Sequence, residues 1–276
     1  MVSAMTTHYP CRLVCLTEET TEALYLMGEE SRIVGISGFT VRPTRARKEK
    51  PRVSAFTSAK LDKILALEPD LVLGFSDMQA DIAAALIRAG VSVHVFNQRS
   101  VAEIFAMLTV LGGLIGEPGK AAALSAQLRA GLDEIAQSAA HLPRHPRIYF
   151  EEWDEPLISG IRWVGELVEL AGGVECFPEL RTEKGAKGRI LADPGELIRR
   201  SPDIIFGSWC GKKFRPERVA ARDGWSEIPA VRDGQLFEIK STDILQPGPA
   251  ALTDGVRQIY NHIERWASGR VARAAP

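Results

Sequence analysis

The stretch Ile64–Gly74, ILALEPDLVLG, returns in related form at Leu197–Gly207, LIRRSPDIIFG. Pro, Asp and Gly stand at the same places in both copies, and the apolar positions around them correspond. Each copy predicts a helix that ends before the proline and a buried strand that ends at the glycine. The likeness favours two lobes of related architecture over the simpler view that any α/β protein repeats such units.

Strand and helix patterns alternate on both sides of these copies, which indicates layered sheets with mostly parallel strands. The strands are almost continuously apolar, as expected where helices cover both faces of a sheet. We predict strands at Arg12–Leu16, Ile33–Ser37, Val53–Phe56, Asp70–Phe75, Val91–Phe96, Arg147–Trp153, Asp203–Trp209 and Leu236–Ile239. We predict helices at Glu18–Met27, Ala59–Leu67, Gln79–Ala89, Gly160–Ala171, Pro194–Arg200 and from about Ala250 to Trp266.

The segment from residue 101 to residue 140 has no strand signal and is helical throughout, with a break near Gly116. Pro118 is well placed to open its second helix, because the first turn does not need the N–H that proline lacks. The predicted fold class is α/β, with two Rossmann-like lobes joined by a long backbone helix and a ligand cleft between the lobes. The expected divisions are an N-terminal lobe, 1–98, a linker with the long helix, 99–142, and a C-terminal lobe, 143–276.

The 276 residues are 45% hydrophobic and 25% charged, and the formal net charge is -1. These values exclude a disordered or disulfide-dense chain and give no general reason to expect nucleic acid as a partner. No C-x-x-C pair occurs, so buried free thiols are expected for Cys11, Cys15, Cys176 and Cys210.

The first ten residues contain no basic region followed by an apolar stretch, and no window reaches the length of a membrane span. As encoded, we expect a cytoplasmic, soluble chain that is not embedded in a membrane. A start further upstream that encodes an apolar leader would place the protein in the periplasm.

Signatures of enzymes are mostly missing from the sequence, since it has no nucleophile elbow, phosphate-binding loop or zinc-binding motif. The densest acidic cluster, Glu151–Glu155 with Trp153 inside it, ends a predicted strand. Its carboxylates could serve acid–base catalysis, but a solvated rim is the favoured interpretation. We therefore expect no catalytic residues, no metal ligands and no cofactor.

Aromatic residues stand at or just after the ends of four predicted strands: Phe39, Phe75, Trp153 and Trp209. In open α/β sheets the carboxyl ends of the strands face the ligand crevice. Any one of these rings alone is more often part of a core. Taken together, they favour rings on both lobes that face each other across a cleft and hold a flat ligand.

Basic residues follow the same strand ends in two runs, although a solvated face is the default for either. The first has few apolar residues and no helical period, and the second follows Trp209. Two runs in a near-neutral chain suggest a ligand with carboxylate, phosphate or catecholate charge. The runs are Arg42, Arg45, Arg47, Lys48, Lys50 and Arg52, and Lys212, Lys213 and Arg215.

Several stretches resemble a known family over most of the chain, from about Arg12 to Trp266. They are Ile33–Ser37 (IVGIS), Leu61–Phe75 (LDKILALEPDLVLGF), Tyr149–Gly160 (YFEEWDEPLISG), Trp163–Gly173 (WVGELVELAGG) and Ser201–Gly207. The chain is similar to the helical-backbone, or class III, substrate-binding proteins of ATP-driven importers. EEWDEPLISG, followed by the helix that ends in AGG, points to the cobalamin-binding branch.

The resemblance implies a non-catalytic protein that binds a corrinoid such as cobalamin, or a similar metal chelate, between its lobes. It also implies one acidic residue on each lobe that docks on a membrane permease, for which Asp81 and Glu217 are the best placements. We expect a monomer. The expected ligand-binding residues are Phe39, Arg42, Phe75, Trp153, Arg162, Trp209, Lys212, Lys213 and Gln246.

Three alternatives stay open. The ligand could be a ferric siderophore or haem, or the protein could be a cytosolic carrier or sensor of a metal chelate. A chelatase-like enzyme on the same fold is the third, with Glu151, Glu152 and His94 as its candidate residues.

Overall fold

The computed structural model describes residues 9–269, and the chain forms two compact units. Unit 1 contains the chain up to Gln98 together with Ala102–Gln127, and unit 2 contains Arg99–Val101 together with the chain from Leu128. The segment predicted as a separate linker is thus divided between them. No helix among residues 9–269 is long and apolar enough to cross a membrane.

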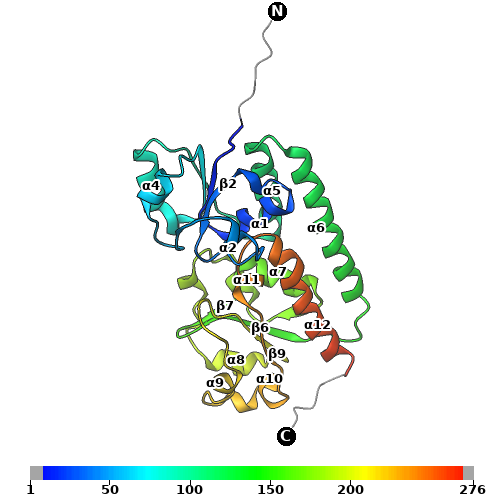
Figure 1. Ribbon diagram of the computed structural model, residues 1–276. Helices are drawn as coiled ribbons and strands as arrows, with labels where there is room; N and C mark the ends of the chain where they lie inside the picture. The colour runs from blue at the N-terminus through cyan, green and yellow to red at the C-terminus, as the bar shows by residue number, and fades with distance from the viewer. Residues whose placement is uncertain (1–8, 270–276) are drawn as a thin grey trace, which may run out of the picture. The chain divides into compact units, whose positions relative to one another are not determined.

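Unit 1, which contains β2 in Figure 1, is built on a parallel five-stranded sheet with the order β3-β2-β1-β4-β5. Ile64 and Leu86, from two of its helices, pack with Val14 and Val72 in one hydrophobic cluster. The strands are β1 (Leu13–Cys15), β2 (Ile33–Ser37), β3 (Arg52–Ser54), β4 (Leu71–Phe75) and β5 (Val93–Phe96). The helices are α1 (Glu18–Leu26), α2 (Ala46–Glu49), α3 (Leu61–Leu65), α4 (Ala80–Arg88) and α5 (Val101–Leu114), with 3-10 turns at Glu30–Arg32 and Asp77–Gln79.

The long helix α6 (Pro118–Ala139), green in Figure 1, begins at the predicted proline. Its residues through Gln127 belong to unit 1, and those from Leu128 belong to unit 2. Within unit 1, Lys120 and Arg32 both form ion pairs with the buried Glu29, which fixes the first turn of the helix.

Unit 2 contains a mixed sheet in which β10, β9 and β6 run parallel, β7 pairs antiparallel with β6, and β8 pairs parallel with the start of β6. The strands are β6 (Arg147–Asp154), β7 (Leu157–Ser159), β8 (Val174–Glu175), β9 (Ile204–Gly207) and β10 (Leu236–Glu238). The helices are α7 (Arg162–Leu170), α8 (Gly195–Arg200), α9 (Pro216–Ala220), α10 (Pro229–Arg232), α11 (Ser241–Ile244) and α12 (Val256–Ala267). Short 3-10 turns lie at Pro178–Thr182, Ala186–Arg189 and Trp225–Glu227, and a π-helical turn, Ala251–Gly255, precedes α12.

The repeated sequence forms the same local structure in both units. The residue before each proline, Glu68 or Ser201, has a positive φ, which ends the preceding helix. The carboxylate of Asp70 then accepts hydrogen bonds from the backbone N–H groups of Cys11 and Arg12, next to β1. The carboxylate of Asp203 accepts one from the N–H of Arg147, the first residue of β6. Each aspartate therefore joins its strand to the start of a neighbouring strand.

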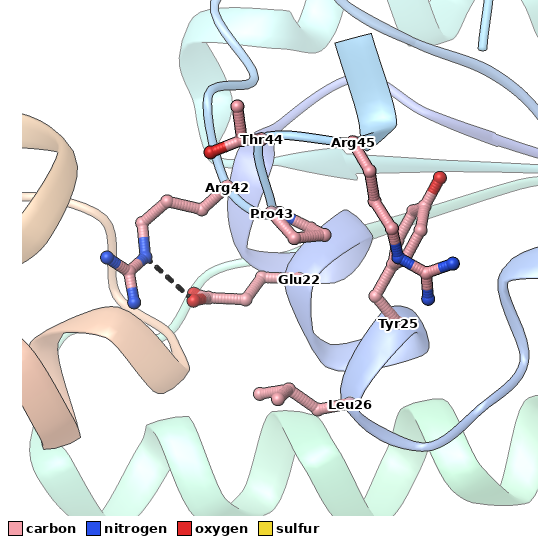
Figure 2. A pocket seen from close by; sticks show the side chains of 7 residues that line it. All are labelled: Glu22, Tyr25, Leu26, Arg42, Pro43, Thr44 and Arg45. Carbon is pink, nitrogen blue, oxygen red and sulfur yellow. Dashed lines mark hydrogen bonds and ion pairs between the residues drawn. The ribbon is translucent and has the colours of Figure 1, made fainter. Parts of the chain in front are cut away.

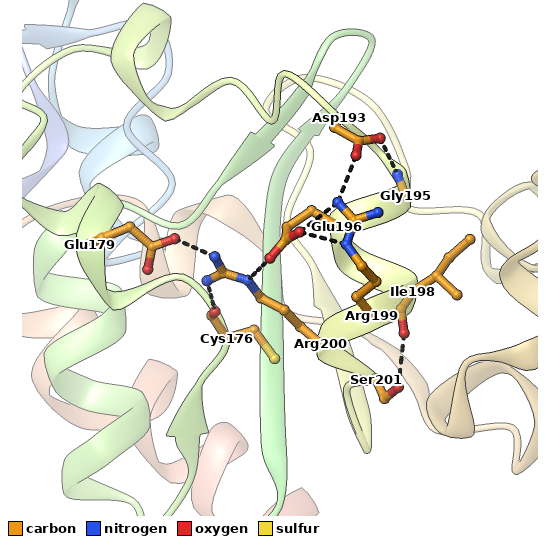
Figure 3. Close-up of polar contacts among 9 residues, drawn as sticks. All are labelled: Cys176, Glu179, Asp193, Gly195, Glu196, Ile198, Arg199, Arg200 and Ser201. Carbon is orange, nitrogen blue, oxygen red and sulfur yellow. Dashed lines mark hydrogen bonds and ion pairs between the residues drawn. The ribbon is translucent and has the colours of Figure 1, made fainter.

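Polar contacts on unit 2 hold α8 against the segment that precedes it (Figure 3). The Arg200 guanidinium bonds to Glu179, to Glu196 and to the carbonyl oxygen of Cys176. Arg199 pairs with Glu196 and with Asp193. Most of these side chains are substantially exposed, so we regard the network as positioning rather than as a major source of stability.

The predicted α/β class with mostly parallel strands is confirmed, but two local predictions are wrong. Cys11 and Cys210 are exposed, because Cys11 precedes the short strand β1 and Cys210 lies in the loop after β9. Residues Ala46–Glu49, inside the first basic run, form the helix α2. Ala46 is fully buried, so tertiary packing supports a turn of helix that the sequence pattern did not indicate.

Candidate functional site

Two tryptophans lie side by side at the carboxyl end of the unit 2 sheet. The register of β6 against β9 pairs Glu151 with Gly207, and Trp153 and Trp209 each follow two residues later. Trp209 is 3% exposed, and the partly exposed Trp153 packs against the hydrophobic cluster that contains it. The pairing of these parallel strands therefore brings together two rings that are far apart in the sequence.

The Lys212 side chain covers this pair of rings. Its ammonium lies 4.2 Å from the ring centroid of Trp153 and 5.0 Å from that of Trp209, and it forms an ion pair with the buried Asp154. A cation over two indole faces is attracted by their negative π-surfaces. Lys212 is therefore already engaged by protein groups, and it shields Trp209 from solvent.

A hydrogen bond to the buried Glu151 fixes the position of the Trp209 ring. This glutamate is 0% exposed, and its Oε1 accepts a hydrogen bond from the Trp209 indole N–H at 3.0 Å. The Arg222 guanidinium donates to both of its oxygens, at 2.6 and 3.0 Å. Burial raises the pKa of Glu151, while Arg222 and the indole N–H act in the opposite direction. The arrangement fixes the ring and leaves neither carboxylate oxygen without a donor.

The other acidic side chains of this cluster are also paired with cations from distant segments. Glu152 forms a two-point contact with the buried Arg189, and the exposed Glu155 lies 3.4 Å from Arg218. The prediction of a solvated rim is therefore wrong for Glu151 and Asp154, which are buried. Each of these carboxylates is therefore held by a cation from another part of the chain.

Gly207 leaves room for the Phe214 ring, which packs against Trp209. The Phe214 ring packs edge-on against Trp209 with 5.0 Å between centroids. A methyl group built on Gly207 would overlap atoms of the Phe214 ring. Glycine is therefore required here by close packing rather than by its backbone angles.

A pocket of about 310 Å³ opens beside Trp209 in unit 2. It lies between the loop after β9 and the segment that follows β10, both at carboxyl ends of parallel strands. Its lining includes Lys212, Lys213, Glu238 and Lys240.

Unit 1 has a pocket of its own, of about 450 Å³, between α1 and the segment that leads into α2 (Figure 2). Arg42 lines it and forms an ion pair with Glu22 at 2.8 Å. The Arg45 guanidinium lies 4.6 Å from the centre of the Tyr25 ring, whose hydroxyl donates to Glu49 at 2.7 Å. The exposed Leu26 adds an apolar side, so the pocket combines aromatic, aliphatic and cationic groups.

Two buried carboxyl groups stand at the start of α1, near this pocket. Burial raises the pKa of Glu18 to about 8 and that of Glu19 to about 7, with Glu22 adding to both shifts. Glu18 accepts a hydrogen bond from the backbone N–H of Arg42, and Glu19 accepts one from the Thr17 hydroxyl. At neutral pH Glu18 is thus mainly protonated in the folded chain.

The sequence model that describes the periplasmic binding proteins matches residues 13–242. The chain belongs to the periplasmic binding protein family. It is 23% identical over 260 residues to an uncharacterized ABC transporter substrate-binding lipoprotein of Bacillus subtilis, covering 92% of this chain and 80% of that protein. It is also 23% identical to a vitamin B12-binding protein of Vibrio campbellii, covering 92% and 89% of the two chains.

The fold of this periplasmic binding protein is found in solved structures at low sequence identity. A crystal structure of a possible iron-binding (periplasmic solute-binding) protein from Staphylococcus epidermidis superimposes with a TM-score of 0.81 at 20% identity. The match covers 93% of this chain and 99% of that one. The predicted family resemblance is confirmed.

In this periplasmic binding protein, the predicted ligand residues differ in how accessible they are. Phe39 follows β2 and is 62% exposed, whereas Phe75, the last residue of β4, is buried. Arg162 opens α7 and pairs with Glu166 at 2.8 Å. Gln246 is partly exposed in the loop after α11. Unit 2 thus brings together four of the predicted residues: Trp153, Trp209, Lys212 and Lys213.

The predicted docking acids, Asp81 and Glu217, are both exposed in the first turn of a helix, α4 in unit 1 and α9 in unit 2. Of the chelatase residues, Glu151 and Glu152 are held by arginines, and the His94 ring packs against Phe96 at 4.4 Å. Within residues 9–269, no three His, Cys, Asp or Glu side chains gather where they could hold a metal ion.

Several residues near the two pockets of this periplasmic binding protein were not predicted from the sequence. Lys240 directly follows a predicted strand, so the strand-end rule that selected Trp209 applied to it as well. Arg222 and Arg189 do not follow a predicted strand. Each forms an ion pair with its glutamate from a segment without helix or strand periodicity. Tyr25 lies in the predicted helix Glu18–Met27, and its partner Glu49 lies in α2, which was not predicted.

Proposed function

We propose that this protein is the substrate-binding component of an ABC importer and that it binds a corrinoid or a similar metal chelate without transforming it. The observation that carries the proposal is the Trp153–Trp209 pair, held at the carboxyl ends of β6 and β9. Membership of the periplasmic binding proteins supports it, and so does the similarity to a vitamin B12-binding protein.

The chemistry of the paired rings suits a large, flat ligand. An aromatic side chain contributes a broad rigid surface at little cost in conformational entropy. Trp153, the more exposed of the two, is proposed to contact the ligand together with Lys212, whose ammonium lies against its ring, and Trp209 supports Trp153 from within the core. The exposed ring of Phe39 and the guanidinium of Arg42 are the ligand-binding residues proposed for unit 1. Haem and ferric siderophores have similar size and shape and are the alternative ligands.

Fluorescence titration tests the proposal, because the chain has only five tryptophans. Purified protein is titrated with cyanocobalamin, haem and a ferric siderophore. At least one should quench the fluorescence and saturate. Trp153→Ala should then weaken binding about 30-fold, which corresponds to about 2 kcal/mol for an aromatic anchor residue.

Trp266→Phe is the matched control, since that ring stacks on Arg144 and lines neither pocket. It should leave the affinity unchanged. The proposal fails if no chelate binds, or if Trp153→Ala binds as tightly as the natural sequence.

Docking on a permease is proposed to involve Asp81 and Glu217. An exposed acid pairs readily with an arginine of a partner, and charge pairs at interfaces contribute to both encounter and affinity. We predict that Asp81→Ala with Glu217→Ala lowers uptake by cells that carry the cognate importer about tenfold, with ligand affinity unchanged. Asp62→Ala with Glu227→Ala is the control, because these acids are also exposed and lie one in each unit. Equal uptake by both double variants would contradict the assignment.

A further inference from the structure

The unit 2 pocket is bounded by two chain segments that leave the sheet side by side. Gly211, Lys212 and Lys213 follow β9, while Lys240 and Ser241 follow β10. Because β9 and β10 are neighbouring parallel strands, both segments emerge at the same edge of the sheet. Groups at that edge are placed by the sheet itself, with only a few residues of loop between.

The charges around this pocket do not balance. Lys212 is neutralised by Asp154, as described above. Within residues 9–269, Lys213 and Lys240 have no ion-pair partner, and both are exposed. Glu238 is the one acidic residue in the lining, and its Oε1 is taken by the backbone N–H of Phe214 at 3.0 Å. The pocket therefore has a surplus of positive charge.

The rest of the lining contributes hydroxyl groups and apolar side chains. Ser241 and Thr242 place hydroxyl groups at the pocket, where the Thr242 hydroxyl donates to Asp243 Oδ1 at 3.4 Å and the Ser241 hydroxyl bonds to Cys210. The buried side chains of Trp209 and Ile239 form the apolar part of the pocket lining. Ammonium groups beside one small pocket suit a carboxylate or phosphate, with which they form charge-assisted hydrogen bonds.

We infer that this pocket is a subsite for an anionic oxygen group, a carboxylate or a phosphate, carried by the bound metal chelate. The inference rests on the proposed function and narrows its substrate class to chelates with such a substituent. The group binds to Lys213 and Lys240 while the flat part of the chelate contacts Trp153. Haem would supply carboxylates, and cobalamin would supply the phosphodiester of its nucleotide loop.

The test compares ligands with and without the anionic group. Haem is paired with haem dimethyl ester, and cyanocobalamin is paired with dicyanocobinamide, which lacks the nucleotide loop. For Lys213→Gln with Lys240→Gln, affinity for the anionic member of the bound pair should fall about tenfold, from about 0.7 kcal/mol for each exposed ion pair. Affinity for the partner without the anionic group should stay the same. Whichever pair shows the effect identifies the source of the group.

Lys63→Gln with Lys184→Gln is the matched control, because these lysines are exposed and line neither pocket. It should change neither affinity. If the chelates bind but the Lys213 and Lys240 double variant weakens both members of a pair equally, or neither, the subsite is wrong and the proposed function survives. If no chelate binds the natural sequence, both are wrong.

Discussion

Replacing Arg222 with methionine is expected to lower the free energy of unfolding by about 3–5 kcal/mol, because it leaves a buried carboxylate without its counter-charge. Glu151 is 0% exposed and is held at two points by Arg222. Urea unfolding followed by circular dichroism measures the change.

The pH dependence of this loss separates a charge effect from a packing effect. Without Arg222, the folded-state pKa of Glu151 should rise further, since the arginine is the main influence that lowers it. The group then binds its proton more tightly in the folded state than in the unfolded state. The variant should therefore lose least stability near pH 5 and progressively more as the pH rises towards 8.

Arg218→Met is the matched control, because Arg218 pairs with Glu155 and both side chains are largely exposed. Its cost should stay below about 1 kcal/mol. Equal losses for the two arginine variants would show that the Glu151 pair is not special. A pH-independent loss in Arg222→Met would mean that its aliphatic packing matters and its charge does not.

Replacing Gly207 with alanine is expected to disturb the core and the ligand wall together. The added methyl group overlaps the Phe214 ring, and Phe214 in turn supports Trp209. An extra methyl in a well-packed core costs about 1–3 kcal/mol. We therefore expect lower stability by urea unfolding, a shift of tryptophan emission, and weaker chelate binding.

A second substitution checks the mechanism. Phe214→Leu in the Gly207→Ala background should cost less than the sum of the two single changes, because the smaller side chain makes room for the methyl group. Gly131→Ala is the control: it lies within α6, its added methyl meets no atom, and it should stabilise by about 0.5–1 kcal/mol. Additive costs for Gly207 and Phe214 would contradict the proposed overlap.

The overall fold was largely readable from the sequence, because its determinants are local. Strands β2 and β6, and the helices α5 and α6, begin within a residue of the positions that apolar runs and Pro118 indicate. The repeated Pro-Asp pair predicted equivalent helix–strand joints, and the structure supplies the reason in the hydrogen bonds of Asp70 and Asp203. The short helix α2 was missed, because one turn of helix leaves no periodic pattern.

The candidate site was only partly readable. The strand-end rule selected Trp153 and Trp209, but it could not show that Lys212 covers them or that Trp209 is buried. The acidic cluster was misjudged because its counter-charges, Arg189 and Arg222, follow it in sequence by 37 and 71 residues. Pairings between a strand and distant loop segments depend on the folded chain and produce no local sequence pattern.

The two buried glutamates at the start of α1 change the number of protons bound on folding. The formal charge of -1 counts every glutamate as an anion. With the pKa of Glu18 at about 8 and that of Glu19 at about 7, the native protein retains protons that the unfolded chain releases near neutrality. Folding therefore takes up protons at these two glutamates, whereas His262, whose pKa is lowered to about 4 by burial, acts in the opposite direction.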